Sequence, residues 1–220
     1  MLHISRLITA VALGALAAPA LAAQDLAELC RAASEPKIGQ WASYHVSGGR
    51  TEGDMRLATV ASERVGDSTF FWLEIRFTGK DPSHNGIAQI LVPGVGARGA
   101  SIRGLIMKAG NQPAMKMSSQ MLGMMAPSVT QNNAALDWSK RCAAATVVGW
   151  ESVTVPAGTL RALHVKSPEG DDAWVSRDIP FGLVKVHGKE DVVLTGRGSD
   201  AKSSIAEKPQ EMPEMMMPKP

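Results

Sequence analysis

The sequence lacks a large charge of one sign. Of its 220 residues, 23 are basic and 21 acidic, so the formal net charge at pH 7 is +2. A nucleic-acid-binding domain typically shows a basic stripe and an isoelectric point above about 9. We therefore expect no nucleic-acid partner.

Motifs for catalysis and metal binding are also missing. The histidines beyond residue 23 show neither H-E-x-x-H nor a paired ligand spacing, and no G-x-S-x-G is present. Gly94–Gly99 matches G-x-G-x-x-G, but no helix is predicted to begin there and no acidic residue follows about twenty positions later. We expect no enzyme, no catalytic residue, no metal site and no cofactor. The alternative is an enzyme whose histidines and carboxylates meet only in the folded chain.

The sequence has no apolar run of the length of a typical transmembrane helix, and its main apolar run, near the N-terminus, is short. Leu7–Leu16 follows the basic residues His3 and Arg6 and precedes the small residues of Pro19–Ala23. This order predicts a bacterial secretory signal peptide over residues 1–23, and so a periplasmic or secreted protein. The run is too short and too rich in Ala and Gly for a typical transmembrane helix, although an uncleaved membrane segment is the alternative.

Cysteine occurs only twice, at Cys30 and Cys142. In an oxidising compartment two cysteines predict one disulfide. It would close a loop of more than a hundred residues, worth up to about 4–5 kcal/mol in the chain-entropy model. The alternatives are two free thiols or a thiol that binds a metal.

The region 146–199 has the clearest strand pattern. Short β-branched runs alternate with breaks rich in Pro, Gly and Asp, which predicts an antiparallel meander. We predict five strands here: Thr146–Val155, Thr159–Lys166, Asp172–Ser176, Leu183–His187 and Val192–Arg197. Several of them are apolar on both faces, so both faces of the sheet should be at least partly covered, or one should line an apolar cavity.

The N-terminal half predicts a second run of antiparallel strands. A short helix over Leu26–Ser34 precedes five strands, at Ile38–Ser47, Asp54–Val65, Thr69–Thr78, Ile87–Val92 and Ser101–Ala109. One strand has a clean apolar face that alternates with polar positions. That face consists of Phe71, Leu73, Ile75 and Phe77.

Pro113–Met125 interrupts the strand pattern with a helical period. One face of this predicted helix carries Met117, Met121 and Met124. The helix could pack on the sheet as core, or form a lid that contacts a ligand, because methionine makes adaptable apolar surfaces. A third possibility is copper, which thioethers bind well, with Met115, Met117, Met121 and the methionines of the tail as ligands.

The sequence of Val153–Ile205 resembles those of periplasmic lipoprotein carriers with the LolA/LolB-type fold and of uncharacterised periplasmic families similar to them. The segments that carry the resemblance are V-T-V-P-A-G-T, A-W-V-S-R-D-I-P-F-G-L-V-K and L-T-G-R-G-S-D-A-K-S-S-I. The resemblance implies a strongly curved sheet around an apolar cavity, helices over its mouth, and acyl chains as cargo. It transfers no individual functional residue.

These observations together predict an α+β fold: a long curved antiparallel sheet, an incomplete β-barrel, with short helices packed on its concave face. We expect one such domain over residues 24–205, followed by a disordered tail rich in Pro and Met over residues 206–220.

The predicted function is non-enzymatic binding or carriage of an apolar or acylated ligand such as a lipid. The alternative is a Met-rich copper-binding protein. We expect a monomer that makes transient contact with a membrane or an envelope protein. The predicted cavity lining comprises Phe71, Leu73, Ile75, Phe77, Met117, Met121 and Met124.

Overall fold

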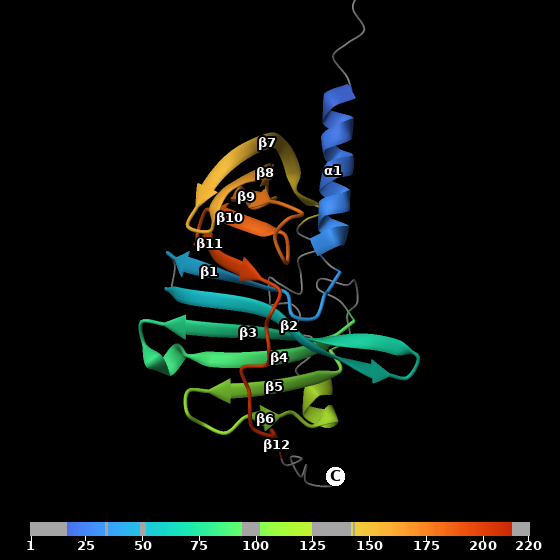
Figure 1. Cartoon of the computed structure of the whole chain (residues 1–220), viewed down its shortest axis with the longest axis vertical. Helices are drawn as coiled ribbons and strands as arrows, with labels where there is room; N and C mark the ends of the chain where they lie inside the picture. Colours follow the sequence, from blue (N-terminus) through green and yellow to red (C-terminus); the bar gives the residue numbers. More distant parts are fainter. Residues whose placement is uncertain are drawn as a thin grey trace, which may run out of the picture.

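The computed structural model describes residues 17–33, 35–48, 52–93, 102–124, 142 and 144–212. One sheet of twelve strands dominates this part of the chain (Figure 1). The elements are α1 (Ala17–Ala33), β1 (Trp41–Ser47), β2 (Gly53–Val65), β3 (Ser68–Gly79), the 3-10 turn η1 (Pro82–His84), β4 (Gly86–Val92), β5 (Gly104–Ala109), β6 (Met115–Lys116), β7 (Thr146–Val155), β8 (Gly158–Lys166), β9 (Asp172–Val175), β10 (Leu183–His187), β11 (Asp191–Gly198) and β12 (Gln210–Glu211).

The strands follow the order β12-β6-β5-β4-β3-β2-β1-β11-β10-β9-β8-β7. Neighbouring strands are antiparallel except β12 and β6, which pair in parallel. The sheet is therefore open and mixed, with β12 and β7 at its two edges, and is not a closed barrel. The predicted long antiparallel sheet with few helices is confirmed, including the five-stranded meander of the second half.

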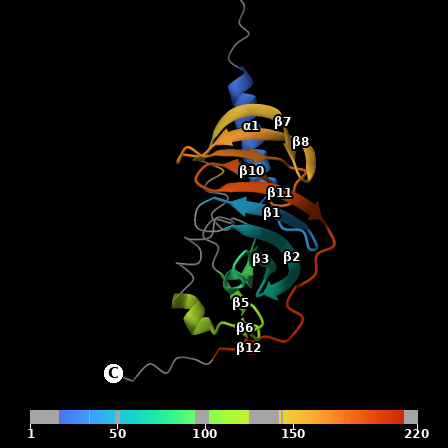
Figure 2. The same ribbon diagram turned by 90° about the vertical axis from the view of Figure 1, so that its left-hand side faces the viewer.

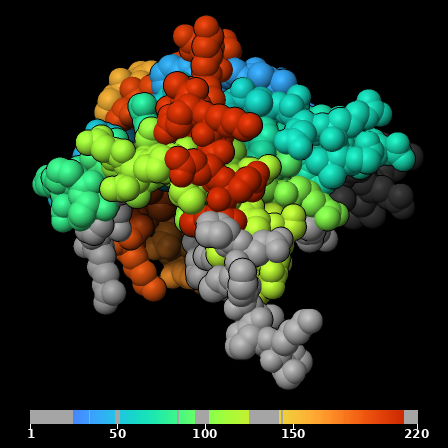
Figure 3. All heavy atoms as spheres, turned by 90° about the horizontal axis from the view of Figure 1, so that it is seen from below, coloured from blue at the N-terminus to red at the C-terminus, as the bar shows by residue number. Residues whose placement is uncertain are grey.

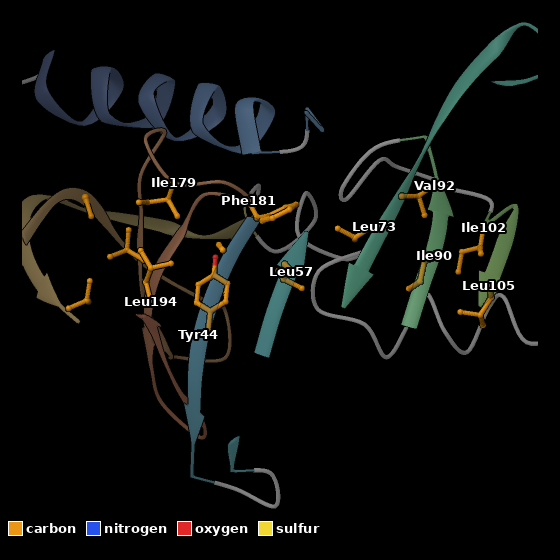
Figure 4. Close-up of a cluster of buried hydrophobic side chains, with 14 of the residues drawn as sticks. Tyr44, Leu57, Leu73, Ile90, Val92, Ile102, Leu105, Ile179, Phe181 and Leu194 are labelled. Carbon is orange, nitrogen blue, oxygen red and sulfur yellow. The ribbon is translucent and has the colours of Figure 1, made fainter. Parts of the chain in front are cut away.

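The face of the sheet that carries Tyr44 holds the main core, and we call it the inner face. Side chains from both halves of the sheet meet there, with Ile179 and Phe181 from the loop after β9 between them (Figure 4). The core side chains of this face that are exposed by 2% or less are Ala42, Tyr44, Leu73, Ile90, Val92, Leu105, Val184 and Leu194. Ala162 belongs to the same cluster but lies on the opposite face of β8 from Leu163. Burying so much apolar surface is the main favourable term in the folding of this domain.

Helix α1 packs on the inner face of the second half of the sheet. Leu26 and Leu29 of the helix share a buried cluster with Leu163, Val165 and Val175. The lateral strand pairs that link the two halves along one face are Val165–Ala173, Ala173–Val186, Val186–Val192 and Val192–Val46. Because paired residues lie on the same face, this row places α1 on the face that carries Tyr44.

The Cys30–Cys142 disulfide is confirmed, with the two Cα atoms 5.9 Å apart. It ties α1 to the residues just before β7. The helix begins at Ala17, so cleavage after Ala22 or Ala23 would leave residues 24–33 to make these contacts. In the described residues, no helix is both long and apolar enough to cross a bilayer.

Residues 199–212, which we call the C-terminal strap, cover the outer face of the first half of the sheet. The strap leaves β11, crosses β2–β5 and ends as β12 beside β6 (Figure 1), and it lies at the molecular surface over the green strands (Figure 3). It lies on the opposite side of these strands from the short helix at residues 119–124 (Figure 2). The cover predicted for both faces was expected for the meander, where the described covering element is α1 on the inner face, whereas the strap covers the first half of the sheet.

A buried carboxylate holds the strap. Glu74 is 1% exposed. Its Oε1 accepts a hydrogen bond from Ser204 Oγ at 2.6 Å, and its Oε2 accepts from Ser204 N at 2.9 Å and Gln89 Nε2 at 2.8 Å. Ile205 packs beside it against Ile106 and Ala114. A buried carboxylate is tolerated because these donors replace water.

Two segments next to or within the strap differ from their predicted structure. The predicted helix over Pro113–Met125 is wrong in its first half, where Met115–Lys116 form β6 between β5 and β12. Sheet hydrogen bonds to both neighbours satisfy this backbone, so the helical period of the side chains does not decide it. Among the described residues the helix covers 119–124, and the Ser118 hydroxyl at its start accepts a hydrogen bond from Met121 N.

The predicted disordered tail also begins later than expected. Residues 206–212 belong to the strap, and Gln210 N and Met212 N donate to the carbonyls of Ala114 and Lys116. The remaining residues of the predicted tail, 213–220, lie outside the described residues.

Candidate functional site

The four predicted residues of β3 share the inner face, but only part of this face is buried. Leu73 is 1% exposed and belongs to the core. Ile75 is half-buried and packs against the core, while Phe71 and Phe77 are also half-buried. Moving along β3 from Leu73 towards Phe77, burial therefore decreases while the side chains stay apolar.

The strand register extends this gradient across the sheet. Leu73 pairs with Thr59 and Ile90, and Ile90 pairs with Leu105, which gives a fully buried row. In the next row, Ile75 pairs with Ala88, Ala88 with Met107, and Met107 with Met115. Every member of this second row is at least partly exposed, and Met107 is 38% exposed.

Six side chains form a partly exposed apolar surface on the inner face, which we call the apolar patch. They are Met55, Ile75, Phe77, Ala88, Met107 and Met115, from β2 through β6. The register aligns Met55 with Phe77, and glycines on both sides make room for this ring. A Cβ atom on Gly53 would lie 2.9 Å from Phe77 Cζ, and one on Gly79 would lie 3.1 Å from Cε1.

The methionines of the predicted helix are divided between the core and the surface. Met117 is 5% exposed and lies in the core cluster, and Met121 and Met212 pack against that cluster. Met124 is 54% exposed and does not contribute to it. The structure thus places Met117 and Met121 in or against the same core cluster as Leu73 and Ile75, but leaves Met124 at the surface.

Two polar groups lie in the apolar core of the inner face. The Tyr44 hydroxyl donates to the Leu183 carbonyl at 3.2 Å, and burial raises the pKa of this phenol well above its usual range. The second group is the Thr59 hydroxyl, which is fully buried and has no hydrogen-bond partner in the described part of the chain.

The outer face of β7–β10 carries an ionic cluster that the sequence did not reveal. His164 bonds through Nδ1 to Glu151 Oε1 at 2.9 Å and through Nε2 to Asp172 Oδ1 at 2.8 Å. The His164 ring stacks on Trp174, with centroids 4.6 Å apart, and Lys185 Nζ lies 5.0 Å from the Trp174 ring centroid. The hydrogen bond from His164 holds the pKa of Asp172 below its ordinary value.

The hydrogen-bonding groups of this cluster are paired with one another. The Trp174 indole donates to Glu151 at 2.7 Å, and both nitrogens of His164 already have carboxylate partners. Its charged residues Glu151, His164, Asp172 and Lys185 come from four separate strands, so no sequence spacing could indicate it. The described residues contain no group of three or more His, Cys, Asp and Glu side chains arranged to hold a metal ion.

Comparison with known proteins gives no family. No family model and no curated protein sequence matches the chain. Among solved structures it is similar to a putative exported protein with a YmcC-like fold from Bacteroides fragilis (10% identity, 75% of this chain and 98% of the other, TM-score 0.38). It is also similar to MucB (9% identity, 83% and 60%, TM-score 0.42) and to MucB in complex with MucA(peri) (10%, 84% and 59%, TM-score 0.43). At these identities and TM-scores the similarities assign no function.

Proposed function

We propose that this chain is a non-enzymatic periplasmic or secreted protein that binds an apolar or acylated ligand on the apolar patch. The observation that carries the proposal is the row Ile75–Ala88–Met107–Met115, which continues the fully buried core row yet is partly exposed. A contiguous exposed apolar surface is uncommon in a soluble monomer and often marks a binding site.

The composition of the patch suits a flexible hydrocarbon. Three of its six members are methionines, which are Met55, Met107 and Met115. Their unbranched, polarisable side chains can adapt to an irregular or variable apolar partner. The remaining members, Ile75, Phe77 and Ala88, lie on paired strands and give the site a rigid floor.

A charge placed in the patch tests the proposal. We expect Met107→Asp to weaken binding of the neutral fluorescent dye N-phenyl-1-naphthylamine at least tenfold (about 1.4 kcal/mol), because the ligand would have to desolvate the carboxylate. Val148→Asp is the matched control, because Val148 is 59% exposed on β7, away from the patch. Equal binding by wild type and both variants would reject the patch as the site.

Copper remains a second candidate because Met107 and Met115 face each other across β5 and β6. Two adjacent thioethers are suited to Cu(I). Native mass spectrometry of protein purified from the periplasm separates the two functions. Co-purifying lipid would support the apolar-ligand proposal, whereas bound copper that is lost in Met115→Leu would support the metal. The same spectrum tests the proposed monomer.

A further inference from the structure

We infer that the Thr59 hydroxyl is the hydrogen-bond donor for a carbonyl oxygen of the bound ligand, so that the ligand is an acyl ester or amide rather than a plain hydrocarbon. This inference rests on the function proposed above and specifies the chemistry of the ligand.

The position of Thr59 joins it to the apolar patch. Thr59 pairs with Leu73 at the start of the buried row, while Leu57, two residues before it, pairs with Ile75 of the patch. Residues two apart in a strand are separated by about 7 Å, and three strand spacings from β2 to β5 span about 14 Å. A hydrocarbon chain lying across Met107, Ala88 and Ile75 would therefore end beside Leu57, and a further step of about 7 Å along β2 would bring its carbonyl to Thr59.

Burying the Thr59 hydroxyl without a hydrogen-bond partner costs folding free energy, and its presence needs a reason. A buried hydroxyl without a partner is unfavourable, and native structures contain few of them. Valine has the same shape, has an equally favourable β propensity and would fill this apolar site without that cost. Thr59 is the only side chain with a buried, unpaired polar atom in the described part of the chain.

The backbone holds Thr59 in a fixed position. Its N–H donates to the Gln40 carbonyl at 3.0 Å, and its carbonyl accepts from Gly39 N at 2.8 Å. A β-bulge between Thr59 and Ala61 follows directly. Bulges recur where a strand must aim one side chain. A donor fixed in this way loses little conformational entropy when it binds its acceptor.

Access to Thr59 requires the side chains that pack over the buried row to move. The buried row that begins at Thr59 ends at Leu105, whose carbonyl accepts a hydrogen bond from Met117 N. Met117 and Leu122 then pack into the core, with Met121 beside them. Ile179 and Phe181 from the loop after β9 lie in the same core cluster, so this loop and the segment 117–124 are the described elements that would open while the sheet stays intact.

The experiment compares two ligands of similar length on three proteins. Methyl decanoate has a carbonyl acceptor and 1-bromodecane does not, and each is titrated against bound N-phenyl-1-naphthylamine. We expect Thr59→Val to weaken methyl decanoate binding about fivefold, the size of one hydrogen bond, and to change 1-bromodecane binding less than twofold. Thr59→Ser, which keeps the hydroxyl, should bind the ester within about twofold of wild type.

Two further readouts distinguish a role in binding from a role in folding. Because the hydroxyl is unpaired in the free protein, Thr59→Val should raise the melting temperature, by about 2–4 °C for a domain of this size. The infrared carbonyl stretch of ¹³C-labelled methyl decanoate should shift to lower frequency in wild type and not in Thr59→Val.

The outcomes are separable. Equal ester affinity in wild type and Thr59→Val, or a lower melting temperature in Thr59→Val, would overturn the assignment of Thr59 and leave the apolar patch standing. If wild type binds neither ligand, the proposed function itself fails, and this inference fails with it.

Discussion

The two halves of the sheet expose opposite faces. In β7–β10 the helix α1 covers the inner face, and the outer face presents the ionic cluster around His164. In β2–β6 the C-terminal strap covers the outer face, and part of the inner face remains open as the apolar patch. The strands follow the same antiparallel pattern in both halves, so the difference comes from which face the two ends of the chain cover.

This difference shows why an apolar ligand would bind one half and not the other. A ligand on the inner face of β7–β9 would have to displace Leu26 and Leu29 and move a helix held by a disulfide. A ligand on the inner face of β2–β6 meets the partly exposed side chains of Met107 and Met115 and, among the described covering elements, the short helix at residues 119–124. Ligand-binding elements generally come from the least stable parts of a structure.

The largest expected effect follows from removing the disulfide, which should destabilise α1 and the strands that it covers. Replacing Cys30 and Cys142 by Ser should lower the free energy of unfolding by about 2–5 kcal/mol, because the unfolded chain regains the entropy of a long loop. Urea unfolding measures this change. Amide exchange should rise most in α1 and β7–β9, and a uniform rise across β2–β5 would show that the two halves unfold as one unit.

Removing the carboxylate that holds the strap should destabilise the first half of the sheet. We expect Glu74→Ala to lower the free energy of unfolding by about 2–3 kcal/mol, because Ser204 and Gln89 lose a buried charged acceptor. Arg76→Ala, an exposed position on the same face of β3, is the control and should change it by less than about 0.5 kcal/mol. If exchange in residues 199–212 is unchanged in Glu74→Ala, the strap is held by other contacts.

The short helix should behave as a lid and not as core. Met121→Ala should lower the free energy of unfolding by only about 1 kcal/mol, whereas the buried Leu122→Ala should lower it by about 2–4 kcal/mol. Amides of residues 119–124 should exchange earlier than those of Val153–Val165. Slow exchange throughout the helix, together with a large loss in Met121→Ala, would identify it as packed core.

The smallest effect concerns the ionic cluster at acid pH. Folding holds the pKa of Asp172 below its ordinary value of 3.8 through the hydrogen bond from His164. Below pH 3.8 the unfolded state takes up this proton first, so the stabilisation is present above that pH and is lost as pH falls through the folded pKa. NMR titration of Asp172 in His164→Gln should show its pKa moving back up, and an unchanged pKa would contradict the assigned cause.

The sequence predicted the sheet better than the site. Strands such as Thr146–Val155 were placed correctly because β-branched runs and turn residues are local signals. The helix predicted over Pro113–Met125 failed at Met115, where pairing with Met107 and with a strand nearly a hundred residues away decides the backbone. Local periodicity cannot register a partner at that separation.

The candidate site shows the same limit. The apolar alternation of Phe71, Leu73, Ile75 and Phe77 correctly indicated one face of β3, but the burial gradient along it depends on what covers each end. Glu74 is one of the polar positions that alternate with this face, and no local sequence signal indicates its contact with Ser204. Thr59 carries no sequence signal at all, because an unpaired hydroxyl is defined only by the core around it.

Photolabelling with a decanoyl ester that carries a diazirine at the end of its chain tests the central claim most directly. The patch account predicts that labelled peptides come from β2–β6, including Met107 or Met115, and that excess methyl decanoate abolishes the labelling. The Met107→Asp variant should lose the label, and Val148→Asp should keep it. Labelling concentrated on α1 or β7–β9, or labelling that methyl decanoate does not compete away, would contradict the account.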